Sequence, residues 1–185
     1  MKKQLGPANC LYPSLTVLAG ANVNGKPNFL TIAHVGIMTL GEISLGINKS
    51  HYTNSGIKEN KTFSVNIPSQ DLVRETDYCG IMTGKNTDKA SLFEVFYGEL
   101  KTAPMIQGCP VNMECELVRT VDFPSHDVFV GRVMASYCDE NVLTGGALDL
   151  SKVRPLLFDM ATKQYFALGA PVAKCWSIGK ECKTR

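Results

Sequence analysis

The amino-acid sequence predicts a mainly β fold, a β-barrel with short helices. Short apolar runs recur between turn signals, and 16 glycines and nine prolines are spread evenly along the chain. The strand patterns do not alternate regularly with helices, which disfavours a doubly wound α/β sheet. We expect about seven or eight strands and two or three short helices, with the sheet closing into a barrel.

The composition is that of an ordinary folded protein, and we expect a single domain over residues 1–185. Hydrophobic residues make up 44% and charged residues 19% of the chain, which excludes disorder, collagen and coiled coil as descriptions of the whole. The net charge of +2 predicts no binding to nucleic acid or to an anionic membrane. No apolar run approaches the roughly 20 residues that span a bilayer. No apolar signal core follows the first residues, so we expect a cytoplasmic protein.

Seven cysteines are expected to be mostly buried apolar residues rather than a disulfide framework. Their number is odd, the chain has an intracellular character, and no Cys-x-x-Cys pair occurs. Cys79 is the exception, because it is expected to sit in a loop. There it either contacts a flavin or an electron acceptor, or simply fills space in the loop.

The first predicted elements form a hairpin. Residues 15–19 give one strand, residues 24–27 the turn, and residues 28–35 the return strand. Gly25 can take the positive φ that such a turn requires. The return strand is apolar on both faces, with Phe29 and Leu30 on opposite sides. A third strand is expected over residues 42–48.

The pattern then changes to short helices. Residues 53–61 predict a helix with Thr53 as its N-cap, and residues 62–67 a strand that ends before Pro68. Ser69 is expected to cap a second helix over residues 70–79. A glycine-containing loop follows over residues 80–85.

Strand patterns return in the second half of the chain. Apolar and polar residues alternate from Val111 to Val121, as in a strand with one wet face. A second long strand is predicted from His126 to Tyr137. Residues 155–159 and 165–168 predict a final pair.

Several segments have residue types of known catalytic or binding motifs, but their geometry or spacing excludes those motifs. Ser125, His126 and Asp127 have the residue types of a hydrolase triad, but consecutive strand residues point to opposite faces. The segment 80–87 lacks the spacing of a phosphate-binding P-loop. The chain's three histidines have no zinc-ligand spacing.

A segment at the end of the third strand could bind an anion. Residues 48–54 place a cation, hydroxyls and amides where a helix begins, and a helix N-terminus offers free backbone N–H groups. The same residue types also serve as plain helix caps, so the segment alone leaves both interpretations open.

Four segments add a specific pattern. They are Asn24–Thr31 with its Asn-x-x-Thr strand; Ser50-x-x-Thr53-Asn54 followed by Phe63–Ile67; Asp77-x-x-Gly80 with Gly84 and Asp88-Lys89; and His126-x-x-x-x-Gly131-x-Val133. In this order and spacing they resemble the flavin reductase-like, FMN-binding split-barrel family, and within it the flavoredoxin group. The resemblance covers about residues 10–170.

The resemblance implies a split β-barrel homodimer with one non-covalent FMN per subunit near the interface. It assigns three groups of cofactor-binding residues: Asn28, Phe29, Leu30, Thr31, Ile32 and Ala33 along the ring; Asn48, Lys49, Ser50, Thr53 and Asn54 around the phosphate; and Cys79, Gly80, Gly84 and Lys85 in a covering loop. It places His126 near the flavin as a catalytic candidate. The plainer interpretation of His126 is a sheet residue bonded across the barrel.

The implied function is a flavin-dependent oxidoreductase whose electron donor is NAD(P)H or a redox protein. An FMN-binding carrier or sensor without nicotinamide activity is the alternative, and a barrel that has lost flavin is the third reading. Pyridoxamine-phosphate oxidases have the same barrel fold, but the sequence shows no residues that would bind an amine or aldehyde substrate. The segment 34–41 lacks the Ser-x-x-Pro-Pro turn of many relatives, so we expect the nicotinamide side of the pocket to differ here.

Overall fold

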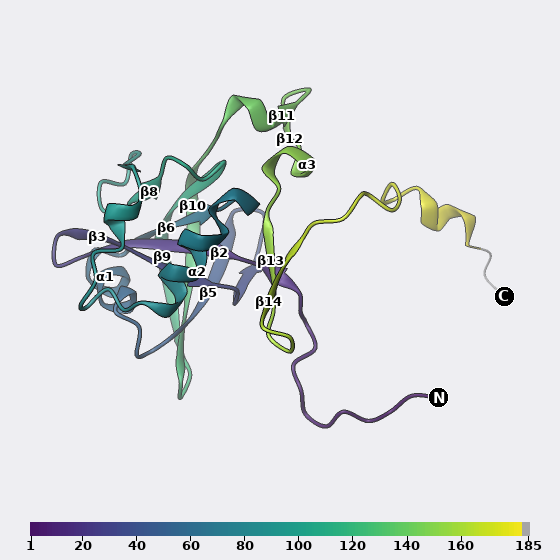
Figure 1. Cartoon of the computed structure of the whole chain (residues 1–185), viewed down its shortest axis with the longest axis horizontal. Helices are drawn as coiled ribbons and strands as arrows, with labels where there is room; N and C mark the ends of the chain where they lie inside the picture. The colour runs from purple at the N-terminus through teal and green to yellow at the C-terminus, as the bar shows by residue number, and fades with distance from the viewer. Residues whose placement is uncertain (183–185) are drawn as a thin grey trace.

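The structure, a computed structural model, describes residues 1–182. Its main sheet has seven strands in the order β3-β2-β6-β9-β10-β5-β4, all pairs antiparallel. The strands are β2 (Val17–Val23), β3 (Lys26–Ile32), β4 (Val35–Ile37), β5 (Glu42–Asn48), β6 (Thr62–Ile67), β9 (Val111–Asp122) and β10 (His126–Cys138). The sheet curls into a half-barrel, which confirms the predicted mainly β, barrel-like fold (Figure 1).

The remaining strands form three small sheets. The terminal sheet pairs β1 (Ser14–Leu15) with β13 (Leu156–Asp159), and β13 with β14 (Gln164–Ala167). The other two are the pairs β7 (Val95–Phe96) with β8 (Met105–Ile106), and β11 (Leu143–Thr144) with β12 (Ala147–Leu148). The terminal sheet joins the two ends of the chain beside the main sheet (Figure 1).

The helices are short, as predicted. The α-helices are α1 (Thr53–Asn60), α2 (Val73–Ile81) and α3 (Leu150–Val153). The 3-10 helices are η1 (Gln70–Leu72), η2 (Ala90–Leu92), η3 (Glu140–Val142) and η4 (Ile178–Glu181). None of the described helices combines the length and the apolar character needed to cross a membrane.

Two apolar clusters hold the main sheet. One fills the inside of the curl and includes Leu30, Leu45, Phe63 and Phe129. The other lies on the opposite face of β3 and includes Phe29. Both faces of β3 are therefore buried, as its sequence predicts, and burial of each large side chain stabilises the fold by about 1.5–3 kcal/mol.

Three local predictions are wrong. The return strand ends at Ile32 rather than at residue 35, because the chain leaves β3 and starts the separate strand β4 at Val35. The N-cap of α1 is Tyr52, not Thr53, and it makes no side-chain capping bond. The second helix begins as η1 and continues as α2 to Ile81, so the predicted loop begins two residues later. The predicted Ser69 cap is confirmed, because its side chain accepts a hydrogen bond from the Asp71 amide.

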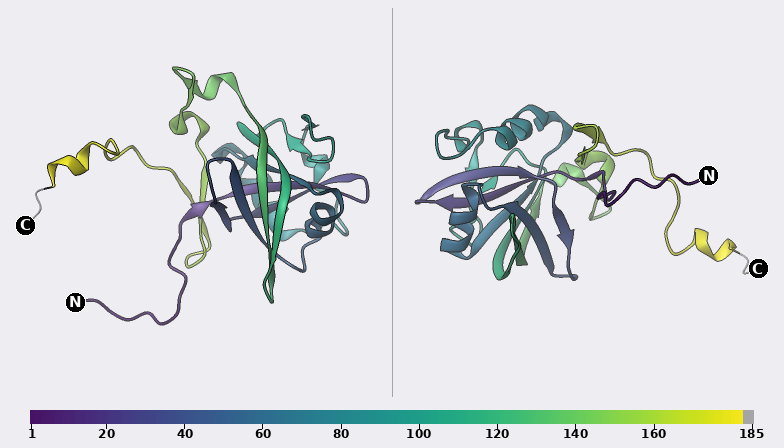
Figure 2. Two further views of the ribbon diagram at one scale, coloured as in Figure 1. Left: turned by 180° about the vertical axis from the view of Figure 1, so that it is seen from behind. Right: turned by 90° about the horizontal axis from the view of Figure 1, so that it is seen from below.

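Both ends of the chain extend away from the body on the same side (Figures 1 and 2). The N-terminal segment reaches β1, and the segment after β14, residues 168–182, forms an arm that ends in η4. Trp176 and Val172 on this arm are 93% and 100% exposed. The arm therefore presents large apolar side chains without covering them.

Candidate functional site

The end of β3 lines two adjoining pockets of about 220 Å³ each. The first, here called the histidine pocket, is lined by Thr31, Ile32, Ala33, His34, Gly46, Asn48, His51, His126, Phe158 and Met160. The second, the tyrosine pocket, is lined by Thr16, Thr31, Ile32, Ala33, Asp77, Gly80, Ile81, Phe158 and Tyr165. The shared residues make one groove along β3. Because β3 is the last strand of the main sheet, one of its backbone edges has no strand partner among the described residues.

Helix α2 fixes one side of this groove. The Thr31 hydroxyl donates to the Thr76 carbonyl in a short contact. A Cβ built on Gly80 would lie 3.4 Å from the Cβ of Thr31, so helix and strand are in close contact there. On the far side, the Tyr165 hydroxyl donates to Oδ1 of Asp77 (3.1 Å). Burial and the Asp77 carboxylate raise the pKa of Tyr165 to about 12.

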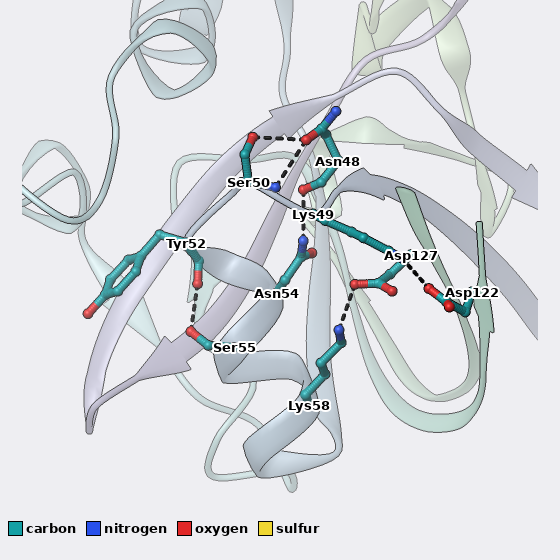
Figure 3. A network of polar contacts seen from close by, with 9 residues as sticks. All are labelled: Asn48, Lys49, Ser50, Tyr52, Asn54, Ser55, Lys58, Asp122 and Asp127. Carbon is teal, nitrogen blue, oxygen red and sulfur yellow. Dashed lines mark hydrogen bonds and ion pairs between the residues drawn. The ribbon is translucent and has the colours of Figure 1, made fainter. Parts of the chain in front are cut away.

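The predicted anion segment is a tightly fastened turn (Figure 3). Oδ1 of Asn48 accepts from the Ser50 amide (3.0 Å) and from the Ser50 hydroxyl (2.9 Å). Nδ2 of Asn54 donates to the Asn48 carbonyl (2.7 Å). Lys49 extends instead to Asp122, with which it forms an ion pair that lowers the pKa of that carboxyl. Ser50 is thus the exposed hydroxyl of this turn.

A third pocket, the loop pocket, lies between the β2–β3 hairpin and the loop after α2. Its volume is about 370 Å³, and Asn28, Tyr52, Gly84, Lys85 and Lys89 are among the residues that line it. Nδ2 of Asn28 donates to Oγ1 of Thr53 (2.7 Å), which explains why Thr53 does not cap its own helix. A Cβ on Gly84 would lie 2.0 Å from Oδ1 of Asn28, so no larger residue fits this approach without movement.

Lys89 is a buried cation behind this loop. Its Nζ donates to the carbonyls of Cys79 (3.0 Å) and Met82 (3.1 Å), the last groups of α2 and the start of the loop. A cation at a helix C-terminus offsets the negative end of the helix dipole. Burial lowers the pKa of Lys89.

The structure contradicts the prediction that Cys79 lies in a loop over the cofactor. Cys79 sits within α2, is completely buried and packs in the cluster with Leu18 and Phe29. Burial raises the pKa of its thiol to about 11, so it remains protonated at neutral pH. The side chains of Phe29 and Leu30 are likewise core residues, which leaves only their backbone for a ligand.

His126 is the first residue of β10 and pairs in register with Asn48 of β5. Its Nδ1 lies 2.9 Å from the Ser125 hydroxyl, and its ring centroid lies 5.8 Å from that of His34. The Tyr12 hydroxyl lies 2.8 Å from Nε2 of His34. Sequence reasoning missed Tyr12 and His34 as site residues. The departure of segment 34–41 from the family pattern was the available signal.

The predicted residues thus divide into those that line the groove, those that line the loop pocket and those that line neither. Thr31, Ile32, Ala33, Asn48, Gly80 and His126 line the groove, and Asn28, Gly84 and Lys85 line the loop pocket. Ser50, Thr53 and Asn54 belong to the turn and helix start that adjoin both. A larger pocket of about 410 Å³, beside the Asp71–Arg154 ion pair, contains none of the predicted residues.

A family model described as the flavin reductase like domain matches residues 9–167. The chain belongs to the flavin reductase-like family. Among solved structures, flavoredoxin from Methanosarcina acetivorans is 43% identical, with 97% of this chain and 98% of that chain covered and a TM-score of 0.94. Flavoredoxin of Desulfovibrio vulgaris (Miyazaki F) is 33% identical, with coverages of 97% and 100% and a TM-score of 0.90.

Two further proteins are similar to this chain. An uncharacterised protein of Archaeoglobus fulgidus is 33% identical over 128 residues, which is 67% of this chain and 72% of that protein. An FMN-binding protein from Thermus thermophilus shares the fold at 21% identity, with coverages of 92% and 97% and a TM-score of 0.76. The family and its neighbours support flavin binding by this chain.

The groove of this family member fits a flavin ring chemically. Ile32, Ala33 and Phe158 offer apolar walls. The unpaired edge of β3 offers backbone donors and acceptors, which suit the pyrimidine part of the ring. Ser50 and the start of α1 offer hydroxyl and amide donors for a phosphate.

Proposed function

We propose that this protein is a homodimeric FMN-binding flavoprotein oxidoreductase that moves electrons through a non-covalent flavin. The observation that carries the proposal is the convergence of Thr31, Asn48, Gly80 and His126 on one groove. These residues come from four separate segments of the chain. The flavoredoxin resemblance assigned Thr31, Asn48 and Gly80 to the cofactor and placed His126 near it as a catalytic candidate. The likeness to a flavoredoxin over 97% of the chain supports it.

FMN rather than FAD is the flavin we propose. The residues predicted for the phosphate form one compact turn at the start of α1, centred on Ser50. A single phosphate monoester suits one such turn, because its charge is held by the hydroxyl and by nearby backbone N–H groups.

When bound, the flavin supplies hydride or single-electron chemistry. The chain's own residues then have three tasks. The β3 edge orients the ring, α2 and the loop with Gly84 and Lys85 restrict access to it, and His126 presents a ring nitrogen that can accept a proton. We propose NAD(P)H or a reduced redox protein as electron donor. We place the protein in the cytoplasm, where its seven free cysteines stay reduced.

An electron carrier without nicotinamide activity is the second candidate. The two structural relatives above 30% identity described here are flavoredoxins. An NADH:FAD oxidoreductase from Streptomyces globisporus shares only the fold, at 14% identity. These identities favour transfer between proteins as the role to test beside nicotinamide oxidation.

The test is the visible absorption spectrum of the purified, untagged protein before and after anaerobic addition of NADH and NADPH. We expect bound flavin that is released as FMN on denaturation. Rapid bleaching by a nicotinamide would make the protein a reductase, and a spectrum that persists would make it a carrier. A colourless protein that also fails to bind added FMN would refute the proposal.

A further inference from the structure

All three histidines of the chain line the histidine pocket. His34 lies between β3 and β4, His51 in the turn before α1, and His126 at the start of β10. The sequence separates His34 from His126 by about half of the chain, and the fold brings their rings to a centroid distance of 5.8 Å. This clustering is independent of the family motif, which includes only His126.

Two of the imidazoles are held by hydroxyl groups. Tyr12 bonds Nε2 of His34 (2.8 Å), and Ser125 bonds Nδ1 of His126 (2.9 Å). Each ring keeps its second nitrogen without a protein partner among residues 1–182. Each can therefore bind one more proton without breaking an internal hydrogen bond.

The charges around the pocket favour an incoming negative charge. None of the residues that line the histidine pocket carries a carboxylate. Burial, Lys89 and His126 lower the pKa of His51, which disfavours a proton on that ring. The nearby carboxylates are engaged: Asp122 with Lys49, Asp127 with Lys58, and Asp77 with Tyr165 in the adjoining tyrosine pocket.

We propose that His34 and His126 are a proton-holding pair that takes up one proton when a flavin in this pocket is reduced, with Tyr12 as the positioning residue for His34. This inference rests on the proposed function. Two electrons and one proton from a hydride donor or a reduced redox protein leave the ring with one negative charge. A second proton then comes from solvent to an imidazole nitrogen of the pair, and no further bond forms or breaks.

The physical reason is the attraction between opposite charges. A negative charge a few ångströms from an imidazole favours its protonated form and raises its pKa. The pair therefore binds more protons beside the reduced ring than beside the neutral oxidised ring. The pair therefore has one pKa beside the oxidised ring and a higher pKa beside the reduced ring. At a pH between these two values, the protein takes up one proton more per two electrons than the flavin alone requires.

The test is the reduction potential of the bound flavin, measured by spectroelectrochemistry from about pH 5 to about pH 8. We expect the potential of the unaltered protein to fall more steeply with pH than that of the His34→Gln/His126→Gln double variant, by one additional proton per two electrons. Tyr12→Phe should shift the pH range of the steep part. Met160→Leu, which changes an uncharged residue of the same pocket, should keep the original slope.

A second readout needs no variant. The imidazole signals of the flavin-loaded protein, followed by NMR, should give higher pKa values in the reduced than in the oxidised state. Equal pKa values in the two states, or equal slopes in the unaltered protein and the double variant, would overturn the inference while bound flavin leaves the proposed function intact. Failure to bind flavin at all would refute the proposed function instead.

Discussion

At the scale of single residues, the structure separates two hydroxyls that the sequence treats alike. Ser50 and Thr53 both belong to the predicted phosphate segment. Thr53 is buried and accepts a hydrogen bond from Asn28, so its hydroxyl already serves the fold. Ser50 is exposed, and among residues 1–182 its hydroxyl bonds only Asn48 in its own turn. Ser50 is therefore the cleaner probe of phosphate binding.

Ser50→Ala should weaken FMN binding about tenfold or more. A hydrogen bond to a charged group contributes about 1.5–3 kcal/mol, and 1.4 kcal/mol corresponds to a factor of about ten in affinity. Isothermal titration of the flavin-free protein with FMN measures the change. Ser55→Ala is the matched control, because its exposed hydroxyl lies on helix α1, which follows this turn, and among the described residues donates only to the Tyr52 carbonyl. Equal affinities of the two variants would show that Ser50 does not bind the phosphate.

At the scale of elements, the loop after α2 is held against β3 by a close approach. The position of Gly84 leaves no room for a Cβ, because Oδ1 of Asn28 would lie 2.0 Å away. Lys89 fastens the other side of the loop to the end of α2. The geometry of the loop pocket thus depends on the absence of a side chain at Gly84 and on the buried cation of Lys89.

Gly84→Ala should push the loop or Asn28 out of place and lower FMN affinity, with a smaller loss of stability. Displacing Asn28 also strains its bond to Thr53, and a net hydrogen bond contributes about 0.5–1.5 kcal/mol. Fluorescence titration with FMN and thermal unfolding measure the two effects. In Gly108→Ala a Cβ meets only Leu72, at 3.9 Å, so this control should change neither. An unchanged FMN affinity in Gly84→Ala would remove this loop from the site.

The same comparison of elements explains what sequence reasoning could predict. The hairpin of β2 and β3 and the long strands β9 and β10 pair with chain neighbours, so alternation and turn residues predict them. The pairing of β1 with β13 joins the two ends of the chain, and no local pattern indicates it. The resemblance assigned Cys79 to a covering loop, and a glycine-containing loop was expected from residue 80, yet α2 continues to Ile81.

The site shows the same division. Motif spacing found Thr31, Asn48 and His126, each of which the fold brings to the groove. Motif spacing did not predict Tyr12 and His34 as site residues. Their contact joins the N-terminal segment to the residues that follow β3, and spacing along the chain does not indicate such a contact. The role of Lys49 could not be foreseen either, since its partner Asp122 lies on the distant β9.

At the scale of the whole molecule, the two terminal segments extend from the body on the same side (Figure 2). The terminal sheet that anchors them supplies Phe158 to both pockets of the groove. The arm after β14 carries exposed Val172, Trp176 and Ile178. Burying each such side chain stabilises an interface by about 1.5–3 kcal/mol. In the expected homodimer, the second subunit would bury them.

Trp176 is the only tryptophan of the chain, so its fluorescence reports directly whether a second subunit buries the arm. If a second copy covers the arm, the emission should be blue-shifted and protected from soluble quenchers at high protein concentration, and should shift to the red as dilution dissociates the dimer. Ile178→Ser should move this transition to about tenfold higher concentration, because a lost apolar contact of about 1.5 kcal/mol corresponds to that factor. Lys174→Ser, a polar change on the same arm, should not move it. Red, fully quenched emission at every concentration would show that the arm stays in solvent, and the dimer would then need a different interface.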